Sequence, residues 1–289
     1  MQEGLILCRF VHFGAVLLLF GSGLFRSVLF TSNLTAFVTR PDSRRLDLQL
    51  AWLTGTALLS ALDWLMLTAG SMAGDWREGF APSTLALVLG HTFFGHVWVV
   101  HLALNLLALI WVIRPGISVK SRLWINALLL LTLAPVGHGA MFDGLRGQLL
   151  ILNQMLHLLG VATWLGGLLM LAVLIKSVDP VGLRAVLLRF SGIGYGLVAV
   201  IIVTGLVNVR ALSGGWWPDP AFSGFGAVLG IKVALVLCML ALAAVNRSLA
   251  RAHVLRLPVL RASVLLEGLS GGAALAAVSL LGTLPPMPG

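Results

Sequence analysis

The sequence predicts an all-α membrane protein, a polytopic helical bundle of about eight transmembrane helices with both termini outside. Three observations lead to this fold class: 59% of the 289 residues are hydrophobic, only 10% are charged, and the mean hydropathy is +1.02. Soluble domains carry about 25% charged residues, so this chain cannot cover a water-facing surface and needs lipid around it. The same composition excludes an intrinsically disordered protein.

A membrane-spanning helix needs about 20 mostly apolar residues, and the chain contains eight such segments. The expected spans cover residues 5–29, 47–70, 86–113, 121–139, 149–176, 188–211, 224–246 and 261–284. The sixth and seventh are separated by residues 213–220, whose glycines and prolines break helices. No extramembrane domain and no internal repeat is evident, so residues 1–289 are expected to form a single transmembrane domain.

The basic residues predict the orientation. The loops after the first, third, fifth and seventh spans hold four, three, three and four of the 19 Lys and Arg residues, and the opposite side holds four. Cytoplasmic loops collect Lys and Arg, so these four loops are expected to be cytoplasmic. Both termini then face outside, which requires an even number of spans. The net charge of +9 is thus explained by membrane topology, and no nucleic-acid partner is expected; the partners of the spans are membrane lipids.

Histidines are the main candidate functional residues. Ionisable side chains within spanning helices are costly and mark functional sites by default, and neutral imidazole is the commonest metal ligand. Together with Cys or Met, imidazole suits copper. The six histidines in apolar segments are His12, His91, His96, His101, His138 and His157.

A copper site in the outer half of the membrane is therefore expected. We expect its core to be His12, His138 and His157, which lie at compatible depths, and the further ligands to be His91, Cys8 and Met155. Cys8 and His12 are four residues apart and share one helix face.

Helix three leaves an alternative open. His91, His96 and His101 recur every five residues, so successive side chains rotate by about 140° on a regular helix. A single metal cannot take all three unless the helix is distorted, and His96 and His101 are expected to be deeper or haem-type ligands. Two histidines from facing helices can bind one haem iron axially, which keeps a b-type haem oxidoreductase as the alternative to a copper transporter.

Three further residues are expected to wall or gate the site: Trp164, Lys232 and Asp63. Trp164 is seven residues beyond His157 and so projects from nearly the same helix face. Its indole N–H should find an acceptor, and the small residues around Gly21 and Gly166 should let helices approach closely. No Walker, HExxH or dinucleotide-binding motif is present, which favours a transporter over an enzyme.

The segment His157-Leu-Leu-Gly-Val-Ala-Thr-Trp164-Leu-Gly-Gly167 resembles the H-x6-W-x-G-G segment of the CopD copper-resistance proteins. The order Thr204-Gly205, Gly226, Lys232, Asn246-Arg247 is similar to their carboxy-terminal pattern, and Arg9-Phe-Val-His12 resembles their amino-terminal start. The resemblance covers nearly the whole chain and is clearest from residue 154 to 249.

This resemblance implies a bacterial inner-membrane protein of copper handling. It implies acceptance of copper at the periplasmic face, transport across the membrane, and a separate periplasmic carrier of the CopC type as partner. A related group in the same superfamily binds haem, which fits the haem b alternative.

Overall fold

The computed structural model describes residues 1–30, 41–137 and 142–284, and in these residues every regular element is a helix. Eight helical segments in the described part are long and apolar enough to cross a membrane, which confirms the predicted number of spans. They are α1 (Gln2–Leu24) with its π-helical extension η1 (Phe25–Leu29), α3 (Pro41–Ala73), α5 (Phe93–Ile113), α6 (Val119–Leu131) with the 3₁₀ turn η4 (Ala134–Val136), α7 (Gly144–Ser177), α8 (Pro180–Ser213), α9 (Gly224–Arg251) and α10 (Leu257–Leu281).

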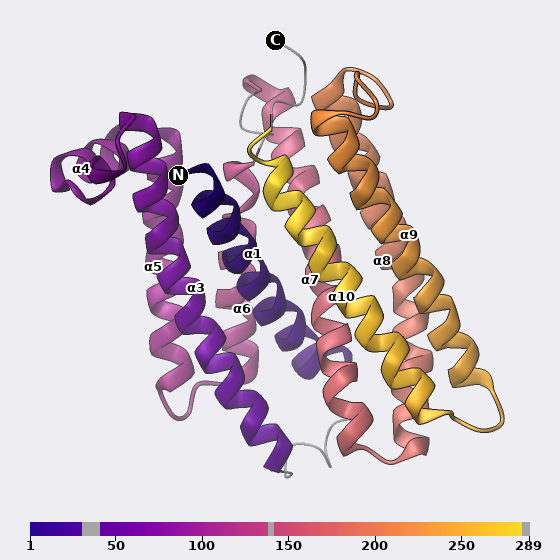
Figure 1. The fold of residues 1–289 in the computed structure, drawn as a ribbon. Coiled ribbons are helices and arrows are strands. Elements are labelled where there is room, and N and C mark those ends of the chain that lie inside the picture. The colour runs from indigo at the N-terminus through magenta and orange to yellow at the C-terminus, as the bar shows by residue number, and fades with distance from the viewer. Residues whose placement is uncertain (31–40, 138–141, 285–289) are drawn as a thin grey trace.

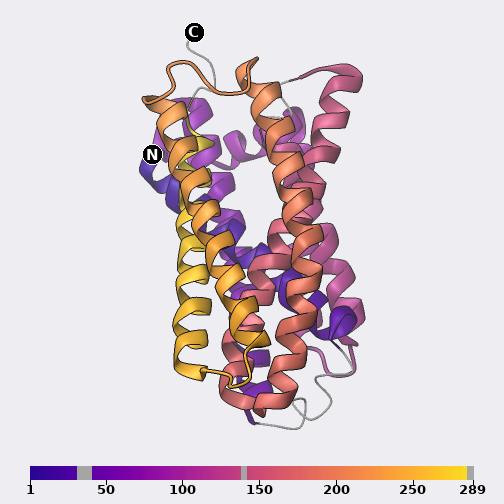
Figure 2. The same cartoon turned by 90° about the vertical axis from the view of Figure 1, so that its right-hand side faces the viewer.

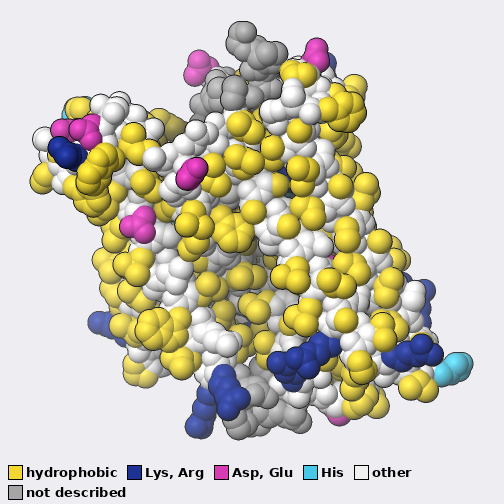
Figure 3. Space-filling view, viewed as in Figure 1, with side chains coloured by type: hydrophobic (Ala, Val, Ile, Leu, Met, Phe, Trp, Pro, Cys, Tyr) yellow, Lys and Arg dark blue, Asp and Glu magenta, His cyan; other side chains and the backbone are white. Residues whose placement is uncertain are grey.

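The helices form one elongated bundle in which α1 is central. It packs against α3 and α6 on one side and against α7 and α10 on the other, and it crosses the middle of the bundle in Figure 1. Helix α1 begins and α10 ends at the upper end in that view, as an even number of spans requires. On the face drawn in Figure 3, most Lys and Arg side chains gather at the lower end. The assignment of that end to the cytoplasm stays a prediction.

The third predicted span was wrong as a single helix over residues 86–113. The chain instead forms α4 (Pro82–His91), turns at Thr92 and starts again as α5. Thr92 is extended, with φ −112° and ψ 150°, and its hydroxyl accepts a hydrogen bond of 2.9 Å from the Gly95 amide, which caps α5. Gly95 also packs against the Val88 backbone, where a β-carbon would collide. Helix α4 consequently lies beside the upper end of the bundle (Figure 1), and His91 is outside the spanning helix.

The crossing of α1 and α7 depends on two glycines. A β-carbon on Gly21 would collide with the Ala162 carbonyl, and one on Gly166 would collide with the backbone of Gly21. Next to this contact, a β-carbon on Gly167 would meet the Phe190 ring of α8. The predicted close approach of helices at these small residues is confirmed.

Two apolar clusters fill the bundle on either side of this crossing. The first joins α1, α3, α5 and α6 and includes Trp64 and Trp98. The second joins α7, α8, α9 and α10 and includes Trp164 and Met170. One group of polar side chains lies against the first cluster and a second borders members of both clusters, and these two groups are the candidate sites.

Candidate functional site

The first polar group is a pair of histidines, His12 of α1 and His101 of α5. Their Nε2 atoms lie 2.8 Å apart, and both side chains are completely buried, with 0% exposure. Trp98 stacks on the His101 ring at a centroid distance of 4.6 Å, and Trp64 meets the His12 ring edge-on at 5.7 Å. The two imidazoles therefore face each other inside an aromatic box.

The proton position on His12 follows from its neighbours on α3. Its Nδ1 lies 3.1 Å from the Ala57 carbonyl oxygen and 3.0 Å from the Ser60 hydroxyl oxygen. A carbonyl oxygen can only accept a hydrogen bond, so Nδ1 carries the hydrogen and donates it. The neutral His12 ring then has its lone pair on Nε2, directed at His101.

The proton position on His101 can change without movement of the ring. Its Nδ1 lies 2.7 Å from the Thr132 hydroxyl, which can also donate to the Leu129 carbonyl at 2.7 Å. When Thr132 donates to Nδ1, His101 donates its Nε2–H to His12. When Thr132 donates to Leu129, it accepts from Nδ1–H, and the Nε2 lone pair of His101 also faces His12. Rotation of one hydroxyl thus selects between a hydrogen-bonded pair and two converging lone pairs.

Two converging lone pairs can hold a cation between them. Anchoring of Nδ1–H on a carbonyl or hydroxyl is the arrangement that orients metal-binding histidines. Metal–imidazole bonds of first-row ions are about 2 Å long, so the Nε2 atoms would have to separate to about 4 Å. That is a shift of about 1 Å, which two side chains can share.

A cavity of about 460 Å³ lies beside this pair, near the start of α1. It is lined by Cys8, Asp63 and Met66, and also by Ser60, whose hydroxyl contacts His12. Cys8 donates its thiol hydrogen to the Ser60 carbonyl at 3.1 Å. Cys8 and His12 therefore do share one face of α1, as their spacing predicts. Thiol, thioether and carboxylate groups thus line a cavity that shares Ser60 with the surroundings of His12.

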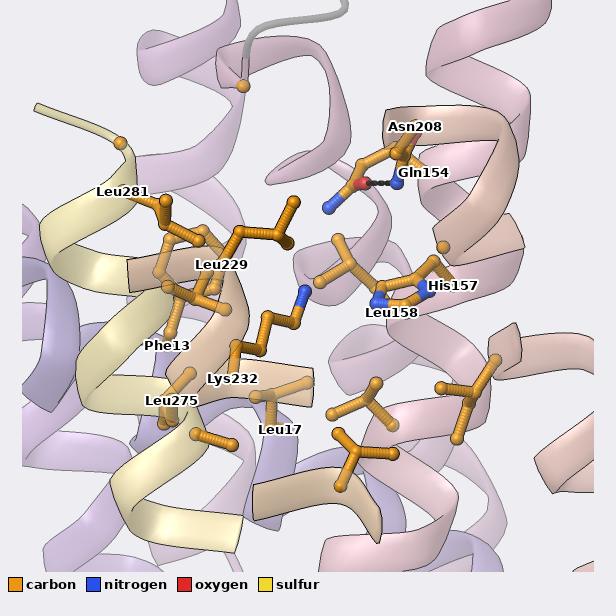
Figure 4. A pocket seen from close by; sticks show the side chains of 18 of the residues that line it. Phe13, Leu17, Gln154, His157, Leu158, Asn208, Leu229, Lys232, Leu275 and Leu281 are labelled. Carbon is orange, nitrogen blue, oxygen red and sulfur yellow. Dashed lines mark hydrogen bonds between the residues drawn. The ribbon is translucent and has the colours of Figure 1, made fainter. Parts of the chain in front are cut away.

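The second polar group surrounds a cavity of about 230 Å³ among α1, α7, α8, α9 and α10. His157 lies on its wall, with Nδ1 2.8 Å from the Thr204 hydroxyl. Thr204 itself donates to the Val200 carbonyl at 2.5 Å. The His157 ring lies next to Gly205, where a β-carbon would be in ordinary van der Waals contact with Cε1 at 3.7 Å. Figure 4 shows Lys232 extending its ammonium into the cavity towards His157.

Trp164 lies below this cavity and is only 7% exposed. Its indole donates a 2.7 Å hydrogen bond to Glu267 of α10, so the predicted acceptor exists. The other carboxylate oxygen of Glu267 accepts from Asn246 at 2.8 Å. Sequence reasoning missed Glu267, although a carboxylate within the apolar run of residues 261–284 was a visible signal.

The structure does not bring the predicted ligands into one site. Within the described residues, no group of three or more His, Cys, Asp or Glu side chains is arranged to hold a metal ion. His12 meets His101 and not His157, which has its own cavity. His138 lies outside the described residues, so its part in a site stays a prediction.

The remaining predicted ligands lie apart from the histidine pair. His91 ends α4 and is exposed. His96 is also exposed and lies 2.9 Å from the Gly90 carbonyl. Met155 packs against the first apolar cluster.

The haem alternative receives no support. Axial ligation would place a macrocycle between two imidazoles, but the His12 and His101 ring centroids are only 4.9 Å apart. Trp98 and Trp64 close the remaining sides of the pair.

Comparison with known proteins places the chain among copper-resistance membrane proteins. Residues 1–148 match the copper resistance protein D-like N-terminal domain, and residues 184–281 match copper resistance protein D. The chain is 28% identical to inner membrane protein YebZ of Escherichia coli (strain K12), over 97% of this chain and 98% of that protein. No solved structure matches it.

Two further relatives carry copper in their names. Copper resistance protein D of Pseudomonas syringae pv. tomato is 28% identical over 84% of this chain and 80% of its own length. Copper transport protein CutJ of Bacillus subtilis (strain 168) is 30% identical over 68% of this chain and 38% of its own length. The chain therefore belongs to the copper resistance protein D-like family and is a multi-pass protein of the inner membrane.

Proposed function

We propose that this chain accepts copper at the periplasmic face and carries it across the inner membrane through the His12–His101 pair. The observation that carries the proposal is the approach of two buried Nε2 atoms to 2.8 Å, with both Nδ1 atoms held by neighbouring groups. Such a pair is a ready two-nitrogen ligand set for one soft cation.

Cu(I) suits this pair better than Cu(II). Cu(I) readily accepts two opposed ligands, whereas Cu(II) prefers tetragonal sites with more nitrogen or oxygen donors. No carboxylate contacts either imidazole among the hydrogen bonds of the described residues. A single positive charge is easier to bury in such a site than two. The faces of Trp64 and Trp98 can stabilise that charge further.

Entry through the cavity at the start of α1 fits the same ion. Its sulfur groups on Cys8 and Met66 suit Cu(I), and Asp63 provides attraction for a cation at the rim. Ser60 connects this cavity to His12. A periplasmic carrier of the CopC type would deliver the ion here.

The residues expected to gate the site, Trp164 and Lys232, line the second cavity and not the histidine pair. Trp164 also donates to Glu267, so its removal would enlarge this cavity. A gating role of Trp164 for copper stays a prediction, and copper uptake by Trp164→Ala compared with the parent tests it.

Copper binding by the purified protein in detergent tests the proposal. Titration with Cu(I) against a competing chelator should give one tightly held ion per chain, and His12→Ala or His101→Ala should abolish it. His96→Ala is the matched control, because His96 is exposed and its ring nitrogen contacts the Gly90 carbonyl. Proteoliposomes containing the parent should take up copper, and those containing either pair variant should not.

Unchanged copper binding in both His12→Ala and His101→Ala would overturn this assignment. Copper binding without copper uptake by proteoliposomes would reject the transport role and retain only the copper-binding role.

A further inference from the structure

The copper proposal does not explain why the Lys232 side chain lies within the membrane-spanning bundle. It lies eight residues after Gly224, the first residue of α9, or about 12 Å along the helix. Its ammonium extends into the second cavity (Figure 4) and makes no hydrogen bond or ion pair with any residue that the structure describes. An intramembrane ammonium without a partner is costly and marks a functional site.

Among the described residues, the cavity wall contains no counter-ion for this charge. Its charged lining residues are Lys232 and Arg9, and no Asp or Glu is among the described residues that line it. Arg9 donates to the carbonyl of Gly282, which also lines the cavity, at 2.8 Å, and its guanidinium lies over the Trp64 ring. The buried carboxylate Glu267 accepts hydrogen bonds from Trp164 and Asn246 and is not among the described residues that line this cavity. A positively charged cavity of this kind disfavours a copper ion and favours an anion.

Further polar groups point to where such an anion would sit. The Gln154 side-chain oxygen accepts from Asn208 at 2.9 Å, and the amide nitrogen of Gln154 points into the cavity near Lys232 (Figure 4). No hydrogen bond from this nitrogen to another described residue occupies it. Nζ of Lys232 carries three N–H groups, so one can be directed to His157 while the others bind a ligand.

The rest of the cavity is apolar. Leu158, Leu229 and Leu275 are among its walls, and the lining extends to Gly137 and Gly282 at the upper end of the bundle. Helices α8 and α9, which both contribute lining residues, diverge towards that end in Figure 2. A molecule of the bilayer with an acidic head and a hydrocarbon body matches both parts of the cavity.

We propose that this cavity is a binding site for an anionic amphiphile, whose carboxylate or phosphate oxygens are held by Lys232 and Gln154 and whose hydrocarbon chain lies along the leucine wall. Two kinds of lipid can supply this acidic group: a fatty acid through its carboxylate, or an acidic phospholipid through its phosphate. The site is separate from the His12–His101 pair, so its loss leaves copper binding at that pair unchanged.

Native mass spectrometry of the purified full chain in neutral detergent tests this site. The probes are oleate, dioleoylphosphatidylglycerol and the neutral decylubiquinone. The parent should retain one oleate or one phosphatidylglycerol, which distinguishes the two sources. Lys232→Met should lower that occupancy at least tenfold, and Lys232→Arg should keep it. Lys120→Met, at an exposed position in the first turn of α6, and His12→Ala should behave as the parent does.

Leu229→Trp provides a second variant that keeps the lysine and fills the cavity, since Leu229 is buried on its wall. It should also lower occupancy, which keeps the test informative if Lys232→Met fails to fold. Equal binding of the anionic probes by the parent, Lys232→Met and Leu229→Trp would overturn the proposal. Retention of decylubiquinone in place of both anionic probes would overturn it as well.

Discussion

The Nε2 atoms of His12 and His101 lie 2.8 Å apart although the two residues are separated by 89 positions in the chain. Each ring is held from behind, His12 by Ala57 and Ser60 and His101 by Thr132. This relationship turns two isolated histidines of an apolar sequence into one potential ligand pair. It also identifies Thr132 as the residue that determines whether Nε2 of His101 directs a hydrogen or a lone pair at His12.

Removal of the Thr132 hydroxyl should weaken copper binding without removal of either imidazole. Thr132→Val keeps the side-chain shape but leaves Nδ1 of His101 without its partner. Loss of such an outer partner typically lowers metal affinity by about 10–100-fold, and we expect that loss in a Cu(I) competition titration. Thr163→Val is the control, because Thr163 is also buried and donates its hydroxyl to the Leu159 carbonyl of its own helix. Equal affinity of the two variants would show that Thr132 does not position His101.

The buried carboxylate of Glu267 should make Trp164 important for stability. Trp164→Phe removes the donor to one carboxylate oxygen and leaves that oxygen unpaired. We expect a loss of about 1–3 kcal/mol in the free energy of unfolding, measured by thermal or denaturant unfolding in detergent. Trp124→Phe is the control, since Trp124 is 70% exposed. No difference between the two variants would mean that the indole hydrogen bond contributes nothing.

The α1–α7 crossing should tolerate no side chain at its centre. Gly166→Ala places a methyl group against the Gly21 backbone, and such overpacking costs about 1–3 kcal/mol. Gly192→Ala is the matched change, because nothing lies within 4 Å of a β-carbon there and Ala favours helix over Gly. The first variant should melt below the parent and the second at or above it. The reverse order would contradict the close packing of these helices.

The membrane orientation can be tested independently of copper. Reporter fusions after Arg45, Lys120, Arg184 and Arg256 should all report a cytoplasmic location, because these loops carry the excess of Lys and Arg. A fusion after Gly215, between α8 and α9, is the control and should report the opposite side. One periplasmic result among the first four would refute the predicted topology.

Much of the fold could be predicted from the sequence, because span number and loop charge are local properties. The break at Thr92 was missed, since an apolar run hides a turn when the capping threonine lies among hydrophobic residues. The sequence predicts a hydrogen-bond acceptor for the Trp164 indole but does not predict which residue provides it, because α7 and α10 meet only in the assembled bundle.

The candidate site depended even more on tertiary contacts. Similar depth suggested that His12 and His157 belong together, yet the packing order of the helices pairs His12 with His101. Depth along a helix places a residue within the membrane, but it does not determine which neighbour its side chain faces.

X-ray absorption spectroscopy of the Cu(I)-loaded protein tests whether copper binds between His12 and His101. Binding by the two imidazoles predicts a first shell of two nitrogen ligands at about 2 Å, with imidazole scattering beyond it, and loss of this signal in His101→Ala. A first shell containing sulfur, or an unchanged spectrum in His101→Ala, would contradict copper binding between His12 and His101.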